Sequence, residues 1–158
     1  MEPIRFYKVN APYGAFSNFS RHAIEVNGKI YPTSEHYYQS QKFIDVQSQE
    51  TIRLAATPRI AADLGRTLPH LRFDWDDVKI DVMILALEAK FTQHHDLKEL
   101  LLSTKDRTLI EASPTDYYWG EGADKSGQNH LGRLLMLQRA RFEPVEVVYK
   151  TIYKNIHL

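Results

Sequence analysis

The sequence predicts an α+β fold that is mostly helical, organised as a single domain with a small antiparallel sheet. Apolar residues recur at helical spacing in one long segment and several shorter ones, whereas strand character is confined to short stretches near the N-terminus. The chain has 158 residues, which is enough for one hydrophobic core, and it contains no internal repeat, linker or low-complexity segment.

The expected sheet lies near the start of the chain. Residues 4–9 and 23–31 have the composition of short strands. The second stretch contains Asn27-Gly28, a dipeptide that favours positive φ at both positions of a tight turn. We therefore expect a hairpin at this dipeptide.

Helices are expected over most of the remaining chain. The first spans residues 33–46 and a second spans 49–56. A third takes Thr57 as N-cap and Pro58 as first residue, and Gly65 is its expected C-terminal stop.

The later helices are recognised by their apolar stripes. The longest spans residues 76–94, another spans 97–102, and a last one spans 129–142. The stripe of the longest helix is Val78, Val82, Leu85 and Ala89, and that of the last is Leu131, Leu134, Leu135 and Phe142.

Composition excludes several classes of protein. Lysine plus arginine equals aspartate plus glutamate, 20 of each, so any contact with nucleic acid is expected to be local. The absence of cysteine excludes disulfides and cysteine nucleophiles and fits a reducing, cytoplasmic location. The seven histidines show no metal-ligand spacing, and neither a metal nor a cofactor is expected. No segment approaches the ~20 apolar residues of a membrane span.

The most informative segment is the helix that begins after Thr33. Glu35 falls in its first turn, where the helix dipole favours an ionised carboxylate. Tyr38, Gln39 and Lys42 follow at spacings that place them on the same face. This polar face suits a ligand better than a core, although a solvated surface is the alternative.

A second segment, residues 116–129, joins an acid, three aromatic residues and three glycines directly ahead of a helix. Its glycines, among them Gly120 and Gly122, allow backbone N–H groups to converge, and the helix that follows Asn129 favours an anion such as a phosphate. Trp119 offers a flat face to a base, and Asp116 an acceptor. A plain turn-rich connection is the alternative.

Three further positions are open to two interpretations. Phe16-Ser17-Asn18-Phe19 places two aromatic rings around an asparagine, and core packing of the rings is the simpler interpretation. Trp75 lies between two aspartates. Lys90 lies at the edge of the long helix's apolar stripe, where it either extends to solvent or supplies a buried cation.

Taken together, these segments resemble the YbiA-like, or NADAR, family over roughly residues 5–142. The matching motifs include Phe16-Ser17-Asn18-Phe19, Tyr31-Pro32-Thr33-Ser34-Glu35-His36-Tyr37-Tyr38-Gln39, Lys42-Phe43, Trp75, Lys90-Phe91, Leu109-Ile110-Glu111, Asp116, Tyr118-Trp119-Gly120 and Leu131-Gly132. Residues 143–158 extend past the family's usual end. Their apolar positions between Val145 and Ile156 predict a short helix that docks on its own domain or on a second subunit.

The resemblance implies a largely helical α+β fold and a hydrolase of N-glycosidic bonds. The family's functional positions fall on Glu35, Trp75, Asp116 and Trp119. Cleavage of a C–N glycosidic bond passes through an oxocarbenium-like centre, so Glu35 is expected to stabilise charge or activate water, with Asp116 as its partner. Trp75 and Trp119 would stack on the substrate, and Lys42 or Lys90 would anchor a phosphate or, less readily, attack the anomeric carbon. The other expected substrate contacts are Asn18, Phe19, Tyr38, Gly120, Gly122 and Asn129.

Three functions follow from the resemblance. The first is hydrolysis of the phosphorylated ribosylamino intermediates early in riboflavin synthesis, on which YbiA-like members act. The second is removal of ADP-ribose from guanine in nucleic acid, as other NADAR members do. The third is an ADP-ribose-binding module without catalysis, which the two retained carboxylates disfavour.

Overall fold

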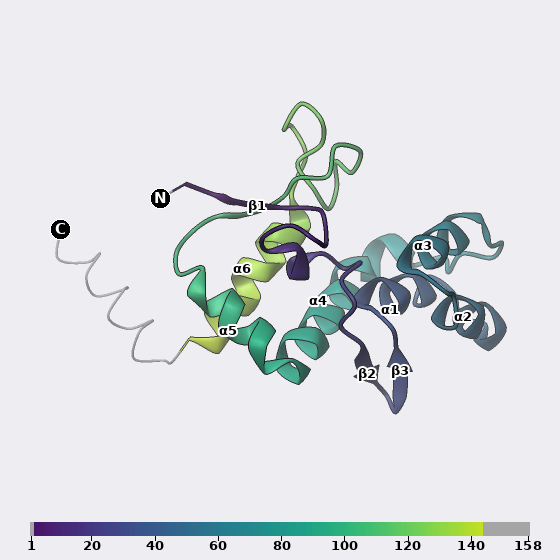
Figure 1. Cartoon of the computed structure of the whole chain (residues 1–158). Helices are drawn as coiled ribbons and strands as arrows, with labels where there is room; N and C mark the ends of the chain where they lie inside the picture. Colours follow the sequence, from purple (N-terminus) through teal and green to yellow (C-terminus); the bar gives the residue numbers. More distant parts are fainter. Residues whose placement is uncertain (1, 144–158) are drawn as a thin grey trace. The chain divides into compact units, whose positions relative to one another are not determined.

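The computed structural model describes residues 2–143, in which helices dominate and the strands are short (Figure 1). The elements in chain order are β1 (Ile4–Phe6), a 3-10 helix η1 (Gly14–Phe16), β2 (Ile24–Val26), β3 (Lys29–Tyr31), α1 (Ser34–Ser40), α2 (Val46–Arg53), α3 (Pro58–Thr67), α4 (Trp75–Gln93), α5 (His95–Ser103), β4 (Leu109–Glu111) and α6 (His130–Phe142). The predicted mostly helical α+β class is confirmed. The small sheet is found as two separate two-stranded sheets, β1 with β4 and β2 with β3.

The chain divides into two compact units. Residues 6–95 form the first, which we call the hairpin unit. Residues 2–5 together with 96–143 form the described part of the second, which we call the loop unit. The tail beyond Glu143, where a docking helix is expected, lies outside the described residues.

The predicted hairpin is confirmed in the hairpin unit. β2 and β3 pair in antiparallel register with Ile24 opposite Tyr31 and Val26 opposite Lys29. Asn27 and Gly28 connect the strands with φ values of 52° and 74°, the conformation that this dipeptide favours.

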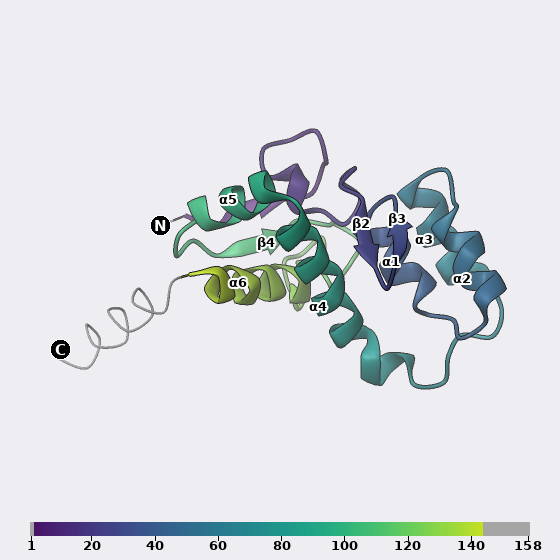
Figure 2. The same ribbon diagram turned by 90° about the horizontal axis from the view of Figure 1, so that it is seen from below.

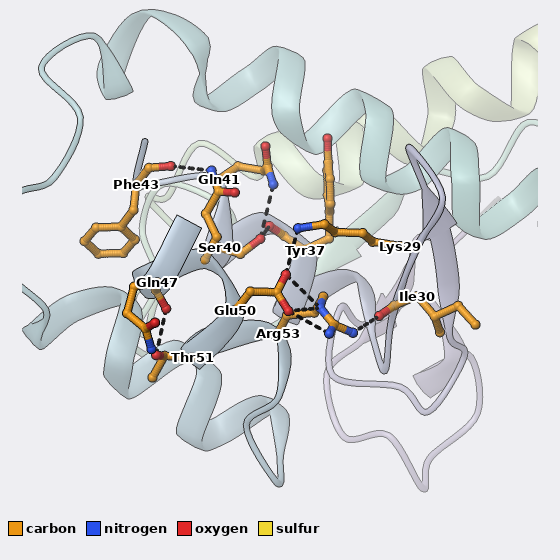
Figure 3. A network of polar contacts seen from close by, with 11 residues as sticks. Lys29, Ile30, Tyr37, Ser40, Gln41, Phe43, Gln47, Glu50, Thr51 and Arg53 are labelled. Carbon is orange, nitrogen blue, oxygen red and sulfur yellow. Dashed lines mark hydrogen bonds and ion pairs between the residues drawn. The ribbon is translucent and has the colours of Figure 1, made fainter. Parts of the chain in front are cut away.

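Polar contacts tie this hairpin to α2 (Figure 3). Glu50 accepts hydrogen bonds from Lys29 Nζ at 2.8 Å and from Arg53 Nη2 at 2.7 Å. Arg53 Nη1 also donates to the backbone oxygen of Ile30 at 3.0 Å. Hydrogen bonds from Arg53 and Lys29 lower the pKa of Glu50 to about 2.

Helix α1 lies in contact with α2, α3, α4 and β3, and all its residues are buried. Thr33 caps it as predicted, since its side chain accepts from the backbone N–H of His36 at 3.3 Å. The expected extension to residue 46 is wrong, because the chain turns after Ser40. Asp45 then caps α2 by accepting from Ser48 N at 2.7 Å, so α2 starts earlier than expected.

The predictions for α3 and α4 hold in position but not in detail. Thr57 caps α3 and Pro58 opens it, but Gly65 lies inside the helix instead of ending it. On α4, Val82 is buried as expected, whereas Leu85 is 50% exposed. The buried face is turned toward Met83, Ala86 and Lys90, because α1 and β2 pack against that face.

In the loop unit, the backbone N–H of Ile4 on β1 donates to Thr108 O at 2.8 Å, beside β4. Helix α6 packs against β4 (Figure 2). Its expected apolar residues Leu131 and Leu135 are buried, and Asn129 is its N-cap. Within the described residues, no helix is long and apolar enough to cross a membrane.

Candidate active site

Glu35 lies in the first turn of α1 and is buried, with 7% of its surface exposed. Its backbone N–H donates to the carbonyl oxygen of Asn18 at 3.1 Å. One carboxylate oxygen, Oε1, accepts a hydrogen bond of 2.7 Å from Gln39 Nε2 one turn later in the helix. The solvated-face interpretation of this helix is therefore wrong, and the polar face is interior.

Asn18 holds the start of α1 in place. Its Oδ1 accepts from Ser34 Oγ at 3.0 Å, and its Nδ2 contacts Met83 Sδ at 3.2 Å. Because its backbone carbonyl also accepts from the N–H of Glu35, Asn18 fixes the backbone of the residue that carries the carboxylate. The neighbouring Phe19 is half-buried, and the Arg59 guanidinium lies 5.7 Å from its ring centroid.

Tyr38, Lys42 and Trp75 gather beside Glu35 in the hairpin unit. The Tyr38 and Trp75 rings are both buried and meet edge to face at 5.1 Å between centroids. Lys42 Nζ lies 5.9 Å from the Tyr38 centroid and 5.8 Å from that of Trp75. Aromatic faces attract a cation, so both rings help to hold the ammonium.

Burial lowers the pKa of Lys42, the negative charge of Glu35 partly offsets that effect, and the positive charge of Arg66 lowers the pKa further. The ammonium also donates a long hydrogen bond of 3.4 Å to the backbone oxygen of Gly65. This part of the hairpin unit therefore combines a buried carboxylate, a partly desolvated amine and two aromatic rings.

Lys90, one of the two expected phosphate anchors, lies among backbone and hydroxyl acceptors of the hairpin unit. It is fully buried on α4, and its ammonium donates to Ala15 O at 2.6 Å, Ser17 O at 2.8 Å and Ser20 Oγ at 2.6 Å. An ammonium has three N–H donors, and these hydrogen bonds use them all. Lys90 therefore fixes the segment that carries Asn18.

Asp116 organises the loop in which it lies. Its Oδ1 accepts from the backbone N–H groups of Tyr118 at 2.9 Å and Trp119 at 2.7 Å. These two hydrogen bonds from an aspartate side chain to the backbone that follows it form a turn, which fixes the backbone at Trp119. The half-buried Trp119 ring meets the Tyr118 ring edge to face at 5.0 Å between centroids. Asp116 and Trp119 lie in the loop unit, whereas Glu35 and Trp75 lie in the hairpin unit.

The expected anion site at the start of α6 is not supported, because the loop itself satisfies the N–H groups there. Asn129 N donates to Gly120 O at 3.0 Å, His130 N to Tyr118 O at 3.1 Å, and Leu131 N to Trp119 O at 3.1 Å. Asn129 is also engaged through its side chain, which accepts from Glu111 N and donates to Leu109 O, each at 2.9 Å.

The loop glycines serve close packing. A Cβ on Gly120 would lie 2.9 Å from the backbone oxygen of Glu111, and one on Gly122 would meet the Tyr117 ring. Gly122 also has a φ of +69°, which favours glycine. We therefore assign both glycines to the architecture of the loop.

Two residues of the hairpin-unit site are not recognisable as such from the sequence pattern. The pattern places Gln39 on the same helix face as Glu35 but assigns it no role. The signal that could have found its role is its position four residues after Glu35, because side chains at that spacing are neighbours on a helix. The pattern marks Gly65 only as a helix stop. Among residues 2–143 no cluster of three His, Cys, Asp or Glu side chains could hold a metal ion.

Comparison with known proteins identifies the family. Residues 5–143 match the NADAR domain family. The chain is 51% identical over 140 residues to N-glycosidase Npun_R5314 of Nostoc punctiforme, covering 86% of this chain and 90% of that protein. It is 48% identical over 134 residues to N-glycosidase YbiA of Escherichia coli, covering 84% of each. The NMR structure of E. coli YbiA matches with a TM-score of 0.82 at 47% identity, over 89% of this chain and 84% of that one.

This chain also matches part of a longer protein whose name refers to riboflavin biosynthesis. Riboflavin biosynthesis protein PYRR of Zea mays is 46% identical over 153 residues, which cover 87% of this chain and 25% of that protein. The chain belongs to the NADAR family. This membership, together with the names of the relatives, places it among hydrolases that act on N-glycosyl compounds, as the sequence predicts.

Proposed function

We propose that this chain hydrolyses the C–N glycosidic bond of a phosphorylated ribosylamino compound of the kind formed early in riboflavin synthesis. The observation that carries the proposal is the buried Glu35, oriented by Gln39 and lying beside Lys42 and two aromatic rings. The names of the Nostoc, E. coli and maize relatives support the class of reaction and substrate.

The proposed chemistry follows from what C–N cleavage requires. The bonding electrons leave with the nitrogen and positive charge develops at the anomeric carbon. Water then supplies the hydroxyl group of the free sugar, and its other proton ends on the released nitrogen. A carboxylate fixed in a site of low polarity stabilises such charge strongly, because little reorganisation is needed when the charge develops. Glu35 has this position, and we assign it charge stabilisation or water activation.

Recognition of the substrate phosphate is assigned to Lys42. The positive charge of Arg66 lowers the pKa of Lys42 after the larger effect of burial. An anion beside these two cations would offset their repulsion. The Trp75 ring, edge to face with Tyr38, provides an apolar wall for the ribose or the base.

Asp116 remains the proposed second carboxylate. Both hydrogen bonds to its Oδ1 come from its own loop, which supports a role in fixing the backbone that carries Trp119. A direct role of Asp116 in holding or protonating the leaving base is the alternative, and an asparagine variant separates the two roles.

The test presents purified protein with two substrates in parallel. One is a 5-phosphoribosylamino pyrimidine, with release of ribose 5-phosphate as the readout. The other is an oligonucleotide ADP-ribosylated on guanine, with release of ADP-ribose as the readout. We expect turnover of the first substrate and its loss in Glu35→Gln. Turnover of the second substrate alone would redirect the function to ADP-ribose removal, and binding of ADP-ribose without either turnover would make the protein a binding module.

A further inference from the structure

Gly65 is an unexpected residue at its position. It lies inside α3 and is buried, and it has no positive φ that would call for glycine. Glycine in a helix is less favourable than alanine, so an interior helical glycine usually has a packing or functional reason. The structure supplies such a reason on the side of Gly65 that faces α1.

The side chain of Gln39 occupies the space where a Cβ of residue 65 would lie. A Cβ built on Gly65 would be 2.9 Å from Gln39 Cδ and 3.1 Å from Gln39 Cβ, and it would overlap Gln39 Oε1. Alanine at this position therefore requires the amide of Gln39 to move. Gln39 is itself buried, with 6% of its surface exposed, so it has little room to do so.

The orientation of the Gln39 amide is set by Glu35. An ionised carboxylate only accepts hydrogen bonds, so the amide must turn its Nε2 toward Glu35 Oε1, at 2.7 Å. The opposite end, Oε1, then lies against Gly65 without a hydrogen-bond partner among the described residues. A buried acceptor left in this way costs stability, which indicates that the contact with Glu35 is retained for another reason.

The same glycine also contacts the cation of the site. Its backbone oxygen accepts from Lys42 Nζ at 3.4 Å. Gly65 lies in the last turn of α3, where carbonyl groups lack partners within the helix and favour a nearby positive charge. One residue of α3 thus touches both the side chain that holds Glu35 and the ammonium of Lys42.

We infer that Gly65 is a positioning residue of the glycosidase site: its missing side chain lets Gln39 hold Glu35, and its carbonyl holds Lys42. The inference deepens the proposed function and rests on it for the chemical roles of Glu35 and Lys42. The contacts themselves are independent of the substrate. The function of α3 is accordingly to support the charged groups of α1 and of the turn that follows it.

The test compares Gly65→Ala, Gln39→Ala and the double variant, with Ile52→Val as control. Ile52 is fully buried in a cluster with Phe43 and Ala61, so this control loosens the core and leaves Gly65 and Gln39 unsubstituted. We expect Gly65→Ala to lower kcat about tenfold to a hundredfold while KM changes about threefold or less, as for a displaced reacting group. The acid limb of the pH–rate profile should also move, because the hydrogen bond to the Glu35 carboxylate is weakened.

The double variant distinguishes displacement of Gln39 from a general effect of Gly65→Ala on folding. Gln39→Ala removes the side chain that a Cβ at residue 65 would displace, so adding Gly65→Ala to it should lower kcat by a further factor of about two or less. A further tenfold loss in the double variant, or an unchanged kcat and pH profile in Gly65→Ala, would overturn the inference.

A second readout separates this inference from the proposed function. The side-chain N–H signals of Gln39, measured by NMR without substrate, should shift in Gly65→Ala and stay unchanged in Ile52→Val. Unchanged Gln39 signals in Gly65→Ala would refute the positioning role even in an active enzyme. If Gly65→Ala shows the expected Gln39 shift but the wild-type protein releases no ribose 5-phosphate, the proposed reaction is refuted and the positioning role of Gly65 is not.

Discussion

The α1 region of the hairpin unit and the 116–129 loop of the loop unit are both rich in polar and aromatic residues, yet they satisfy their polar groups differently. Around α1, burial is the leading cause of the lowered pKa values of His36 and Lys42, and Gln39 Oε1 is buried without a hydrogen-bond partner among the described residues. In the loop, hydrogen bonds from Ser126 are the leading cause of the lowered pKa of Asp124.

This difference indicates how the two regions divide their work. Polar groups buried at a cost in free energy are typical of functional sites, because a stable core would replace them with apolar groups. A loop whose carbonyls and N–H groups bind one another is suited to hold a ring such as Trp119 in a fixed place. We therefore propose that the first region carries the chemistry and that the second presents an aromatic surface.

The largest expected effect is that of Glu35→Gln. This change removes the charge and keeps the shape, so kcat should fall about a thousandfold or more, whereas ligand binding and fold should persist. Steady-state kinetics and circular dichroism measure the two quantities. Glu25→Gln, on the exposed face of β2, is the matched control. Activity of Glu35→Gln within a few-fold of wild type would remove the distinction between the two regions.

Lys90→Met tests whether the buried cation is architectural. Its removal takes a charged donor away from two carbonyl oxygens and a hydroxyl, which should lower the free energy of unfolding by about 3 kcal/mol. Lys79→Met, on the same helix and paired with the exposed Asp76, should cost less than about 1 kcal/mol. Urea denaturation gives both values. A raised KM with unchanged stability would instead make Lys90 the phosphate anchor.

Asp116 can be examined by two substitutions. Asn keeps an oxygen that accepts from Tyr118 and Trp119, whereas Ala removes it. If Asp116 presents Trp119, we expect Asp116→Asn to retain kcat/KM within about tenfold of wild type and Asp116→Ala to lose about a hundredfold. Equal and severe losses of kcat/KM in both variants would show that the Asp116 carboxylate takes a direct part in the reaction. The loop would then share the chemical role assigned to α1.

The smallest expected effect is a dependence of stability on pH through His36. Burial lowers its pKa below the ordinary value of 6.5, partly offset by its hydrogen bond to Ala55 O. Below pH 6.5 the unfolded chain therefore binds more protons at this position than the folded chain does. The contribution of neutral His36 to the free energy of unfolding is full above that pH and is lost as the pH falls through the folded-state pKa.

Melting temperatures between pH 7 and pH 5 provide the check. The decrease should be smaller in His36→Gln, which cannot gain a proton, than in wild type. His95→Gln, at an exposed position, is the matched control for the loss of an imidazole. Identical curves for His36→Gln and wild type would show that burial of His36 does not couple to folding.

Local sequence determined the elements whose signals are local. Thr33 and Thr57 cap their helices, Asn27 and Gly28 make the hairpin turn, and the long helix lies within one residue of its predicted range at each end. These features depend on residues a few positions apart, where backbone preference and capping act. The family motifs likewise mark Glu35 and Trp75 as candidate site residues from the sequence alone.

Tertiary structure alone decided what each buried polar group contacts. Lys90 donates hydrogen bonds to backbone carbonyls, whereas Lys42 lies beside the rings of Tyr38 and Trp75. The two lysines differ because the fold brings different neighbours to each. The sequence pattern predicts that Gly65 ends a helix. Only the packing of α3 against α1 shows that its missing side chain leaves room for Gln39. Such contacts join residues far apart in sequence, and their partners are set by the packing of helices, which local propensity does not encode.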